Sequence, residues 1–296
     1  MRARFWSFAV LAAVVPAAAL GGCSSSKAVK ATSSPSPVAA ATFPATIQAT
    51  NGPVTLPARP SRIVSLSASL TEDLFAIGAG PQVVAVDDQS NYPTGVPKTS
   101  LSGFTPNVEA IAGYRPDLVV VSDDVKGLVG QLKALSIPTL LEAATSNLDG
   151  AYAEITQLGA ASGHTSEAAG LIQTMKSKVT ALLAKLPKRT KPLTYYYELD
   201  QTLFTVTSHT FVGNLFTAAG MVDIADRAGS SSDYPQLNAE TLLSSNPDLI
   251  FLADTKCCGQ SAATVSARPG YSTIAAVKNG RVVALDDDIA SRWGPR

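Results

Sequence analysis

The pattern of hydrophobic and polar positions in this chain contains one unit that occurs twice. Residues 107–123 (NVEAIAGYRPDLVVVSD) and 238–254 (NAETLLSSNPDLIFLAD) share an asparagine, a glutamate two residues later, a Pro-Asp-Leu, an apolar run and a final aspartate. The asparagine can cap a short helix and the proline ends it, while the apolar run is typical of a strand buried in a parallel sheet. A single recurrence at this distance predicts two similar lobes rather than a solenoid, whose periods are about 20–50 residues.

Strand and helix patterns alternate on both sides of the chain's midpoint. Before it, the apolar runs predict strands at 62–67, 83–86, 118–121 and 139–141 and helices at 70–77 and 126–135. After it, they predict strands at 193–198, 249–252 and 281–285, an extended segment at 203–207 and a helix at 210–219. This order is typical of βαβ units around a parallel sheet. We therefore expect an N-terminal α/β lobe over residues 53–163 and a C-terminal α/β lobe over residues 188–296.

A long amphipathic segment separates the two predicted lobes. Its apolar side chains fall at positions 168, 172, 175, 179, 182 and 186, along one face of a helix. We expect a helix over residues 164–187, about 30 Å long, that joins the lobes as a spine. A packed core helix or a coiled-coil seam is the alternative. The expected fold class is α/β, with two pseudo-symmetric lobes, mainly parallel sheets and a ligand cleft between the lobes.

The N-terminus predicts an exported protein. Arg2 and Arg4 precede an uncharged run over residues 5–20 that is too short for a mature membrane span, so residues 1–22 are predicted to be a secretory signal. The small residues before Cys23 resemble the bacterial lipobox, which implies cleavage before Cys23 and diacylation of its thiol. An ordinary signal peptide with an incidental cysteine is the alternative. Residues 23–52 are rich in Ser, Thr, Ala and Pro and are predicted to be a flexible tether.

Charge and motifs exclude several classes of protein. The chain has 23 basic and 23 acidic residues and no basic stripe, so nothing predicts nucleic-acid binding. It has no nucleophile elbow, P-loop or dinucleotide fingerprint, and we expect no catalysis. His164 and His209 are too few for a receptor of bare Zn²⁺ or Mn²⁺, so no metal site or resident cofactor is expected. Residues 286–288 are three aspartates, which form either a cation site or, more commonly, a solvated turn.

Cysteine usage gives no disulfide framework. Apart from Cys23, the chain contains only the adjacent pair Cys257 and Cys258. Such a pair can form a vicinal disulfide, but two small, partly buried side chains are the commoner outcome.

The order of these segments resembles a known family. RIVSLSASLTEDLFAIGAG, VVAVDDQSNYP, the two repeats, the long helix, YYYELDQTLFTVTS and the terminal strand with its Asp-to-Arg loop resemble the substrate-binding proteins of ABC importers that have a helical backbone. That class captures cobalamin, haem or ferric siderophores, and YYYELDQTLFTVTSHTFVGNLF most resembles its cobalamin-receptor branch. The resemblance implies a monomeric receptor, lipid-anchored on the outer face of the membrane, that delivers a corrinoid to an ABC permease dimer. A ferric-siderophore or haem receptor is the alternative, and a sensor or adhesion lipoprotein is the second.

The resemblance also implies two docking residues. Glu109 and Glu240, the glutamates of the repeat, match the surface carboxylates that dock each lobe onto arginines of the permease. Two like charges at equivalent places on two similar lobes suit a symmetric partner, and charge complementarity gives register and encounter rate. The alternative is that each glutamate only stabilises its helix dipole.

A ligand site is expected where the strands end, because open α/β sheets bind ligands at their carboxyl edge. The candidates are Ser67, Ser69, Gln89, Tyr92, Phe104, Asp123, Tyr197, Glu198, Phe204, Tyr234 and Arg292. The aromatic residues offer rigid apolar area to a large flat ligand, with core packing as the alternative, and Arg292 matches a cleft arginine that meets an amide, carboxylate or phosphate. Gln89, Gly103 and Ser122 stand where cobalamin receptors can place Tyr or Trp, which weighs against a corrinoid. The class usually continues into a closing helix after Gly-Pro-Arg, so we expect an incompletely packed second lobe.

Overall fold

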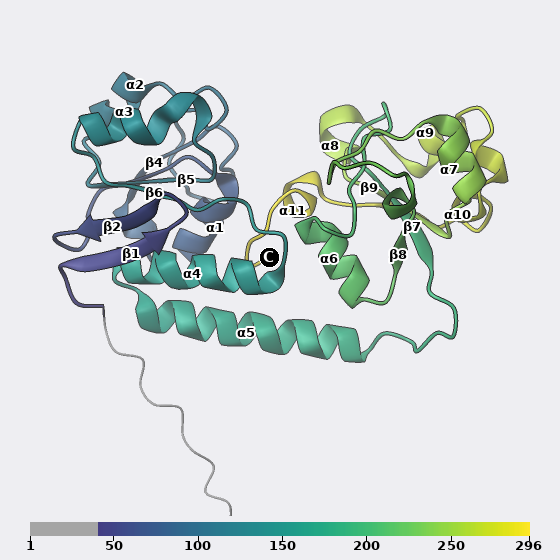
Figure 1. Ribbon diagram of the computed structural model, residues 1–296, viewed down its shortest axis with the longest axis horizontal. Helices are drawn as coiled ribbons and strands as arrows, with labels where there is room; N and C mark the ends of the chain where they lie inside the picture. Colours follow the sequence, from purple (N-terminus) through teal and green to yellow (C-terminus); the bar gives the residue numbers. More distant parts are fainter. Residues whose placement is uncertain (1–40) are drawn as a thin grey trace, which may run out of the picture. The chain divides into compact units, whose positions relative to one another are not determined.

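The computed structural model describes residues 41–296, which form two α/β lobes connected by the helix α5 (Thr165–Ala184) (Figure 1). Each lobe contains a four-stranded sheet whose strands are all parallel. The predicted fold class is therefore confirmed. The predicted signal over residues 1–22, Cys23 and the first part of the tether lie outside the described residues.

The N-terminal lobe is built on a sheet with the strand order β4-β3-β5-β6. Its strands are β3 (Ile63–Ser65), β4 (Val83–Val86), β5 (Leu118–Val121) and β6 (Thr139–Leu141). Its helices are α1 (Ala68–Ala76), α2 (Val108–Gly113), α3 (Leu128–Ala134) and α4 (Leu148–Ser162), with 3₁₀ turns at Gly80–Gln82 and Val125–Gly127. The predicted strands and helices of this lobe all occur, with ends that differ by up to two residues.

The C-terminal lobe repeats this topology with the strand order β8-β7-β9-β10. Its strands are β7 (Thr194–Glu198), β8 (Val222–Asp223), β9 (Leu249–Leu252) and β10 (Val282–Ala284). Its helices are α6 (Phe211–Ala218), α7 (Ala239–Ser245), α8 (Thr255–Cys258), α9 (Ala262–Ser266), α10 (Ala275–Lys278) and α11 (Asp287–Ala290), with 3₁₀ turns at Ala225–Arg227 and Tyr271–Thr273. The predicted extended segment at 203–207 is not a strand. It pairs irregularly with residues 233–236.

Both faces of each sheet are buried, which explains the continuous apolar runs of the central strands. In β5, Leu118 and Val120 pack into one hydrophobic cluster while Val119 and Val121 pack into another on the opposite face. In β7, Tyr196 faces one cluster, and Tyr195 and Tyr197 face the other. All three tyrosines are fully buried. Large aromatic side chains of the central strand thus fill the core of the second lobe, as branched aliphatic side chains fill that of the first.

The duplicated sequence unit folds in the same way twice. Asn107 caps α2 by accepting a hydrogen bond from the Ala110 N–H at 2.8 Å, and Asn238 caps α7 by accepting one from the Thr241 N–H at 2.7 Å. The aspartate of each Pro-Asp-Leu then fixes the start of the neighbouring strand. Asp117 accepts from the backbone N–H groups of residues 61 and 62, and Asp248 accepts from the N–H and hydroxyl of Thr194.

The predicted tether ends earlier than expected. Residues 45–52 were assigned to it, but they belong to a hairpin of β1 (Ala45–Ala49) and β2 (Gly52–Leu56). Its side chains Ile47 and Leu56 are buried in the core of the first lobe. The hairpin is also anchored at the sheet edge, because the Asn51 side chain bonds the backbone of β6. The Thr/Ala-rich composition hid this short strand pair, whose alternation spans only a few residues.

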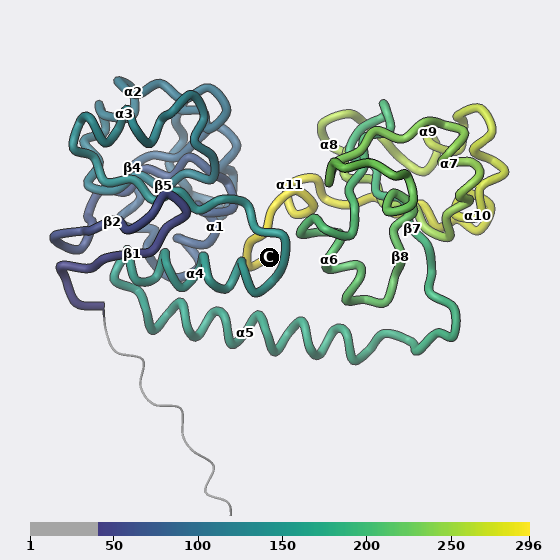
Figure 2. The backbone as a smooth tube through the Cα atoms, viewed as in Figure 1, coloured from purple at the N-terminus to yellow at the C-terminus, as the bar shows by residue number. Residues whose placement is uncertain are grey.

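The spine α5 follows the predicted range, but its apolar face is only partly covered. Ala168 and Met175 are buried in the core of the first lobe beside α4. Further along the same face, Leu182 is 62 % exposed and Leu186 is also exposed. Figure 2 follows the chain from the first lobe through α5 into the second.

Candidate ligand-binding site

A cavity of about 340 Å³ lies at the carboxyl ends of the strands in the first lobe. Its floor comes from the residues that follow β3, β4 and β5, and its remaining wall comes from the segment after α11. Six of the predicted ligand residues line it: Ser67, Ser69, Gln89, Phe104, Asp123 and Arg292. The carboxyl edge of the sheet therefore gathers side chains from distant parts of the chain, as open α/β sheets do at their ligand sites.

A second cavity of about 180 Å³ shares a wall with the first. It contains the predicted residues Tyr197 and Tyr234, and Ser291, Arg292 and Trp293 line both cavities. The aromatic rings that stay accessible are Phe104, which is 74 % exposed, and Tyr234, which is 56 % exposed. Such rings offer flat apolar area to a ligand with a flat face.

Arg292 is held in place by the protein itself. Its Nη1 donates to Glu72 Oε1 at 2.6 Å and to Asn91 Oδ1 at 2.9 Å, and its Nη2 donates to the Gln89 carbonyl at 2.9 Å. Only 8 % of its side chain is exposed. Glu72 is buried and also accepts two hydrogen bonds from Arg296. Arg292 is thus paired with Glu72, which it shares with Arg296, and with Asp288, and no lysine or second arginine lines either cavity.

Buried carboxyl groups lie beneath the shared wall. The Trp293 indole N–H donates to both oxygens of Glu154, at 3.2 and 3.0 Å. Burial raises the pKa of Glu154 to about 7, and it raises the pKa of its neighbour Asp73 well above the usual range, with the Glu154 charge adding to the effect. Burial, followed by the charge of Glu154, raises the pKa of Glu142 to about 8. Like charges cannot all ionise in such surroundings, so we infer that Glu142 holds a proton at neutral pH.

The three aspartates at 286–288 form neither a cation site nor a free turn. Asp287 accepts hydrogen bonds from the first backbone N–H groups of α8, and Asp286 and Asp288 both bind Lys256 Nζ, at 2.8 and 3.0 Å. Among residues 41–296, no group of three or more His, Cys, Asp and Glu side chains is arranged to hold a metal ion. His164 bonds Gln82 and Arg59, and His209 is exposed beside Asp233.

Glu109 and Glu240 occupy equivalent positions on the two lobes. Each lies in the first turn of an asparagine-capped helix, α2 or α7, and each side chain is exposed. A carboxylate at this place stabilises its helix dipole, and it is also free to meet a cationic partner. Both roles predicted for these residues are therefore sterically open.

Comparison with known proteins identifies the family to which this architecture belongs. The sequence profile of the periplasmic binding proteins matches residues 63–289. The chain belongs to the periplasmic binding protein family. A cobalamin-binding protein of Halobacterium salinarum is 29 % identical over 248 residues, which are 81 % of this chain and 67 % of the relative. The ABC transporter substrate-binding lipoprotein YvrC of Bacillus subtilis, described as uncharacterized, is 31 % identical over 246 residues, which are 80 % of this chain and 76 % of the relative.

Solved periplasmic binding proteins with the same fold are named for vitamin B12, iron or haem. The periplasmic vitamin B12 binding protein BtuF of Vibrio cholerae matches this binding protein with a TM-score of 0.66 and 25 % identity, over 80 % of this chain and 91 % of that one. The resemblance inferred from the order of sequence segments is thus confirmed. Family members are substrate-binding proteins rather than enzymes. In the part of this binding protein that the structure describes, none of the helices combines the length and apolar character of a membrane span.

Three predicted ligand residues lie outside both cavities. Glu198 is fully buried, and its two oxygens accept hydrogen bonds from Arg268 at 2.7 and 2.6 Å. The ring of Tyr92 lies under the Arg296 guanidinium, 4.1 Å from ring centroid to Cζ. Phe204 is partly exposed and forms an isolated bridge with Gln236. The structure therefore gives Glu198 the role of an ion-pair partner inside the second lobe.

The roles of two residues that line the cavities become clear only from the structure. Trp293 follows Arg292 directly and reaches both cavities, which sequence reasoning did not single out. Gly103 was noted as a departure from cobalamin receptors, and its reason is steric. A Cβ at this position would lie 2.5 Å from the Leu66 carbonyl oxygen, so an aromatic residue does not fit this backbone.

Proposed function

We propose that this binding protein captures a corrinoid, or a metal chelate of similar shape, at the two adjoining cavities and delivers it to an ABC permease. The observation that carries the proposal is the character of the cavity walls. They combine exposed aromatic rings, hydroxyl and amide groups, and an arginine whose charge is already paired. A ligand that is large, flat, rich in amides and close to neutral suits such walls.

The same walls disfavour the alternative ligands. Haem carries two carboxylates and is held by an axial His, Cys, Met or Tyr. The larger cavity has none of these residues, so the axial ligand would have to be the exposed Tyr234 of the smaller cavity. The acids Asp87, Asp123 and Asp288 line the larger cavity with Arg292 as its one cation. An anionic ferric chelate would meet the same excess of negative charge. A neutral corrinoid meets neither obstacle, and two of the relatives above are named for cobalamin or vitamin B12.

Delivery follows from the paired glutamates. In this proposal the loaded receptor docks one lobe through Glu109 and the other through Glu240 onto cations of a two-fold symmetric permease. The receptor acts as a monomer, and acylation of Cys23 holds it on the outer face of the membrane. The naming of one relative as a lipoprotein supports the anchor, although Cys23 itself lies outside the described residues.

Tryptophan fluorescence offers a direct test. The chain has two tryptophans, Trp6 in the predicted signal and Trp293 in the shared cavity wall. Protein purified without residues 1–22 therefore reports on the site alone. Titration with cyanocobalamin should quench Trp293 saturably, while haem and a panel of ferric siderophores should bind more weakly.

A second readout removes optical artefacts. Equilibrium dialysis of the same protein against each chelate measures binding without relying on the fluorescence of Trp293. Preferential binding of haem or of a ferric siderophore would show that this chelate, and not a corrinoid, is the cargo. Binding of none of these chelates would overturn the proposal and would favour a sensor or adhesion protein.

A further inference from the structure

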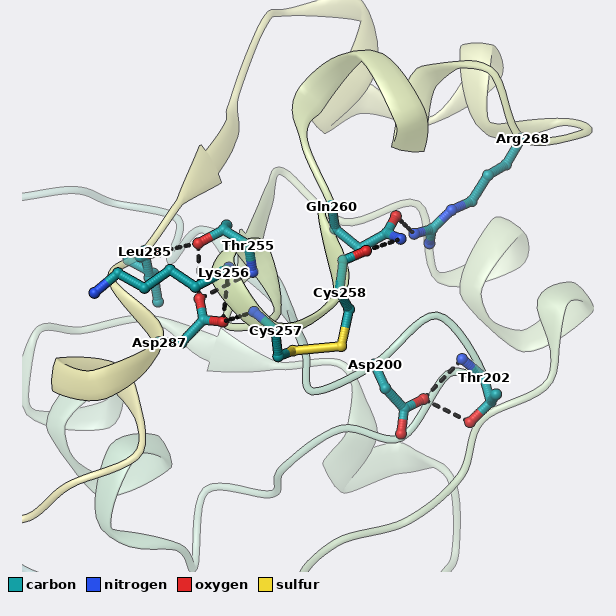
Figure 3. The surroundings of a disulfide bond; sticks show 10 residues. All are labelled: Asp200, Thr202, Thr255, Lys256, Cys257, Cys258, Gln260, Arg268, Leu285 and Asp287. Carbon is teal, nitrogen blue, oxygen red and sulfur yellow. Dashed lines mark hydrogen bonds between the residues drawn. A yellow bond between two sulfur atoms is a disulfide. The ribbon is translucent and has the colours of Figure 1, made fainter. Parts of the chain in front are cut away.

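Cys257 and Cys258 are joined by a disulfide within the four-residue helix α8 (Figure 3). The helix begins three residues after β9, at the carboxyl edge of the second sheet. The equivalent place in the first lobe, after β5, contributes Ser122, Asp123 and Val125 to the larger cavity. The disulfide thus occupies the edge of the sheet that faces ligands in this fold.

One carboxylate holds the start of this helix. Asp287 Oδ2 accepts hydrogen bonds from the N–H groups of Lys256 and Cys257, at 2.8 and 2.9 Å. Its Oδ1 accepts from the N–H and the hydroxyl of Thr255, at 2.9 and 2.7 Å. Figure 3 shows these bonds converging on Asp287 beside the disulfide. Charge-assisted bonds of this kind are the strong ones, so α8 and α11 are fastened together.

Lys256 joins α8 and α11 through a second set of contacts. Its Nζ lies 2.8 Å from Asp286 and 3.0 Å from Asp288, so all three aspartates contact α8. Asp288 lines the larger cavity, and Ser291 and Arg292 follow directly after α11. The position of the cavity wall at Arg292 therefore depends on the contacts that the four-residue helix α8 makes with α11.

A helix this short does not hold its conformation alone, because helix formation begins with a costly first turn. The disulfide closes a small ring that includes the peptide bond between Cys257 and Cys258. This ring limits the backbone conformations of the last two residues of α8. It thereby keeps the Cys257 N–H directed at Asp287. Both cysteines are exposed, so a small dithiol can reach the bond.

We propose that the Cys257–Cys258 disulfide is a positioning element of the cargo site, an inference that rests on the proposed function for its ligand. When the bond is closed, α8 holds α11 and the Arg292 wall in the arrangement that binds cargo. A dithiol reductant opens it by exchange: the S–S bond breaks, the reductant supplies two electrons and two protons, two S–H groups form, and the reductant becomes a disulfide. The released α8 then holds α11 less firmly, and cargo affinity falls.

The test compares three states of the protein in the titration with cyanocobalamin. Oxidised protein should bind most tightly, and protein reduced with dithiothreitol and the Cys257→Ser/Cys258→Ser variant should both bind about fivefold more weakly or worse, as expected for coupled sites. The double variant should show no further response to dithiothreitol. The Asp287→Asn variant, with its disulfide intact, should also bind weakly and lose its response to the reductant.

A second measurement does not need a ligand. Hydrogen exchange of residues 286–293 should be faster in the reduced protein than in the oxidised protein, whereas exchange in β3 and β5 should not change. Equal affinity and equal exchange in the oxidised, reduced and double-variant proteins would overturn the inference. Faster exchange without binding of any chelate would leave the positioning role standing and would count against the proposed function alone.

Discussion

Arg292 shows how far the role of one residue depends on its neighbours. Its place near the end of the chain predicts a cation for the ligand, yet its guanidinium is bonded to the buried Glu72. An unpaired carboxylate at that depth would be costly, and the ion pair removes this cost. Arg292 therefore shapes the wall of both cavities while its guanidinium is paired with Glu72 and Asp288.

Glu142 gives a prediction on the pH dependence of stability. Its pKa is about 8 in the folded protein and about 4.5 ordinarily, so the folded state binds more protons than the unfolded state between these values. The free energy of unfolding should therefore fall as the pH rises from about 4.5 to about 8. The Glu142→Gln variant keeps the neutral shape and should show a shallower fall. Urea denaturation at a series of pH values measures this difference.

The exposed Glu109 supplies the comparison for that experiment. Its Glu109→Gln variant removes one surface carboxylate and controls for the loss of one negative charge. If the Glu142→Gln protein had the same slope as the wild type, Glu142 would not be protonated in the folded state.

Among the elements of secondary structure, the duplicated unit positions the start of the strand that lies next to its own strand in the sheet. An asparagine cap begins its helix, the Pro-Asp-Leu ends it, and the aspartate then bonds the first residues of the neighbouring strand. Arg115 and Asn246, just before the two prolines, both adopt a positive φ, of 48° and 44°. The same backbone path is thus used twice with different side chains.

Substitution of the repeated aspartate tests this interpretation. Asp248→Ala removes the acceptor for the N–H and hydroxyl of Thr194 and should lower the free energy of unfolding by about 1–3 kcal/mol. Asp117→Ala should act in the same direction in the first lobe. Ser244→Ala, on the exposed side of α7, should change stability by less than about 0.5 kcal/mol. Denaturant titration measures all three, and values for the aspartate variants no larger than that of Ser244→Ala would contradict the role.

At the scale of the whole molecule, two lobes with the same topology present the same surface feature twice. Glu109 and Glu240 are exposed at equivalent places, in α2 and α7. Pseudo-symmetry of this kind lets one chain meet two identical subunits. Asp149 has the same local setting, in the first turn of the asparagine-capped helix α4, but lies outside the repeat.

Charge reversal separates docking from local stability. The Glu109→Lys/Glu240→Lys protein should lose most binding to its permease and most uptake, while its cargo affinity stays within about twofold of the wild type, because both residues lie outside the cavities. Asp149→Lys should cost a similar few tenths of a kcal/mol in helix stability and leave uptake intact. Uptake assays in cells and titration of the purified variants give the two readouts. Normal uptake by the double variant would show that docking uses other residues.

Much of the architecture could be read from local patterns. The continuous apolar run of β5, the caps at Asn107 and Asn238, and the long apolar face of α5 are properties of neighbouring residues, and each was predicted near its observed range. The hairpin over residues 45–56 was missed because its two strands are only five residues long and lie inside a stretch that resembles a linker. The extended segment at 203–207 pairs irregularly with residues 233–236 and does not join a sheet.

The candidate site was predicted less completely, for a different reason. Local sequence indicates which residues follow a strand, and so it found Ser67, Gln89 and Asp123. It does not indicate which charge will pair with which. The pairing of Glu198 with Arg268 and the contact of Trp293 with Glu154 join residues far apart in the chain.

Local patterns along the chain are enough to predict the two lobes, their parallel sheets, the connecting helix and the repeated glutamates, because periodicity, caps and duplicated segments are encoded over a few residues. What the cavity wall offers to a ligand depends instead on contacts made in the folded protein. Glu72 pairs with Arg292, Gly103 leaves no room for a larger side chain, and Asp287 joins α11 to the disulfide-bearing α8. Each of these depends on the distance between segments that come together only when the chain is folded.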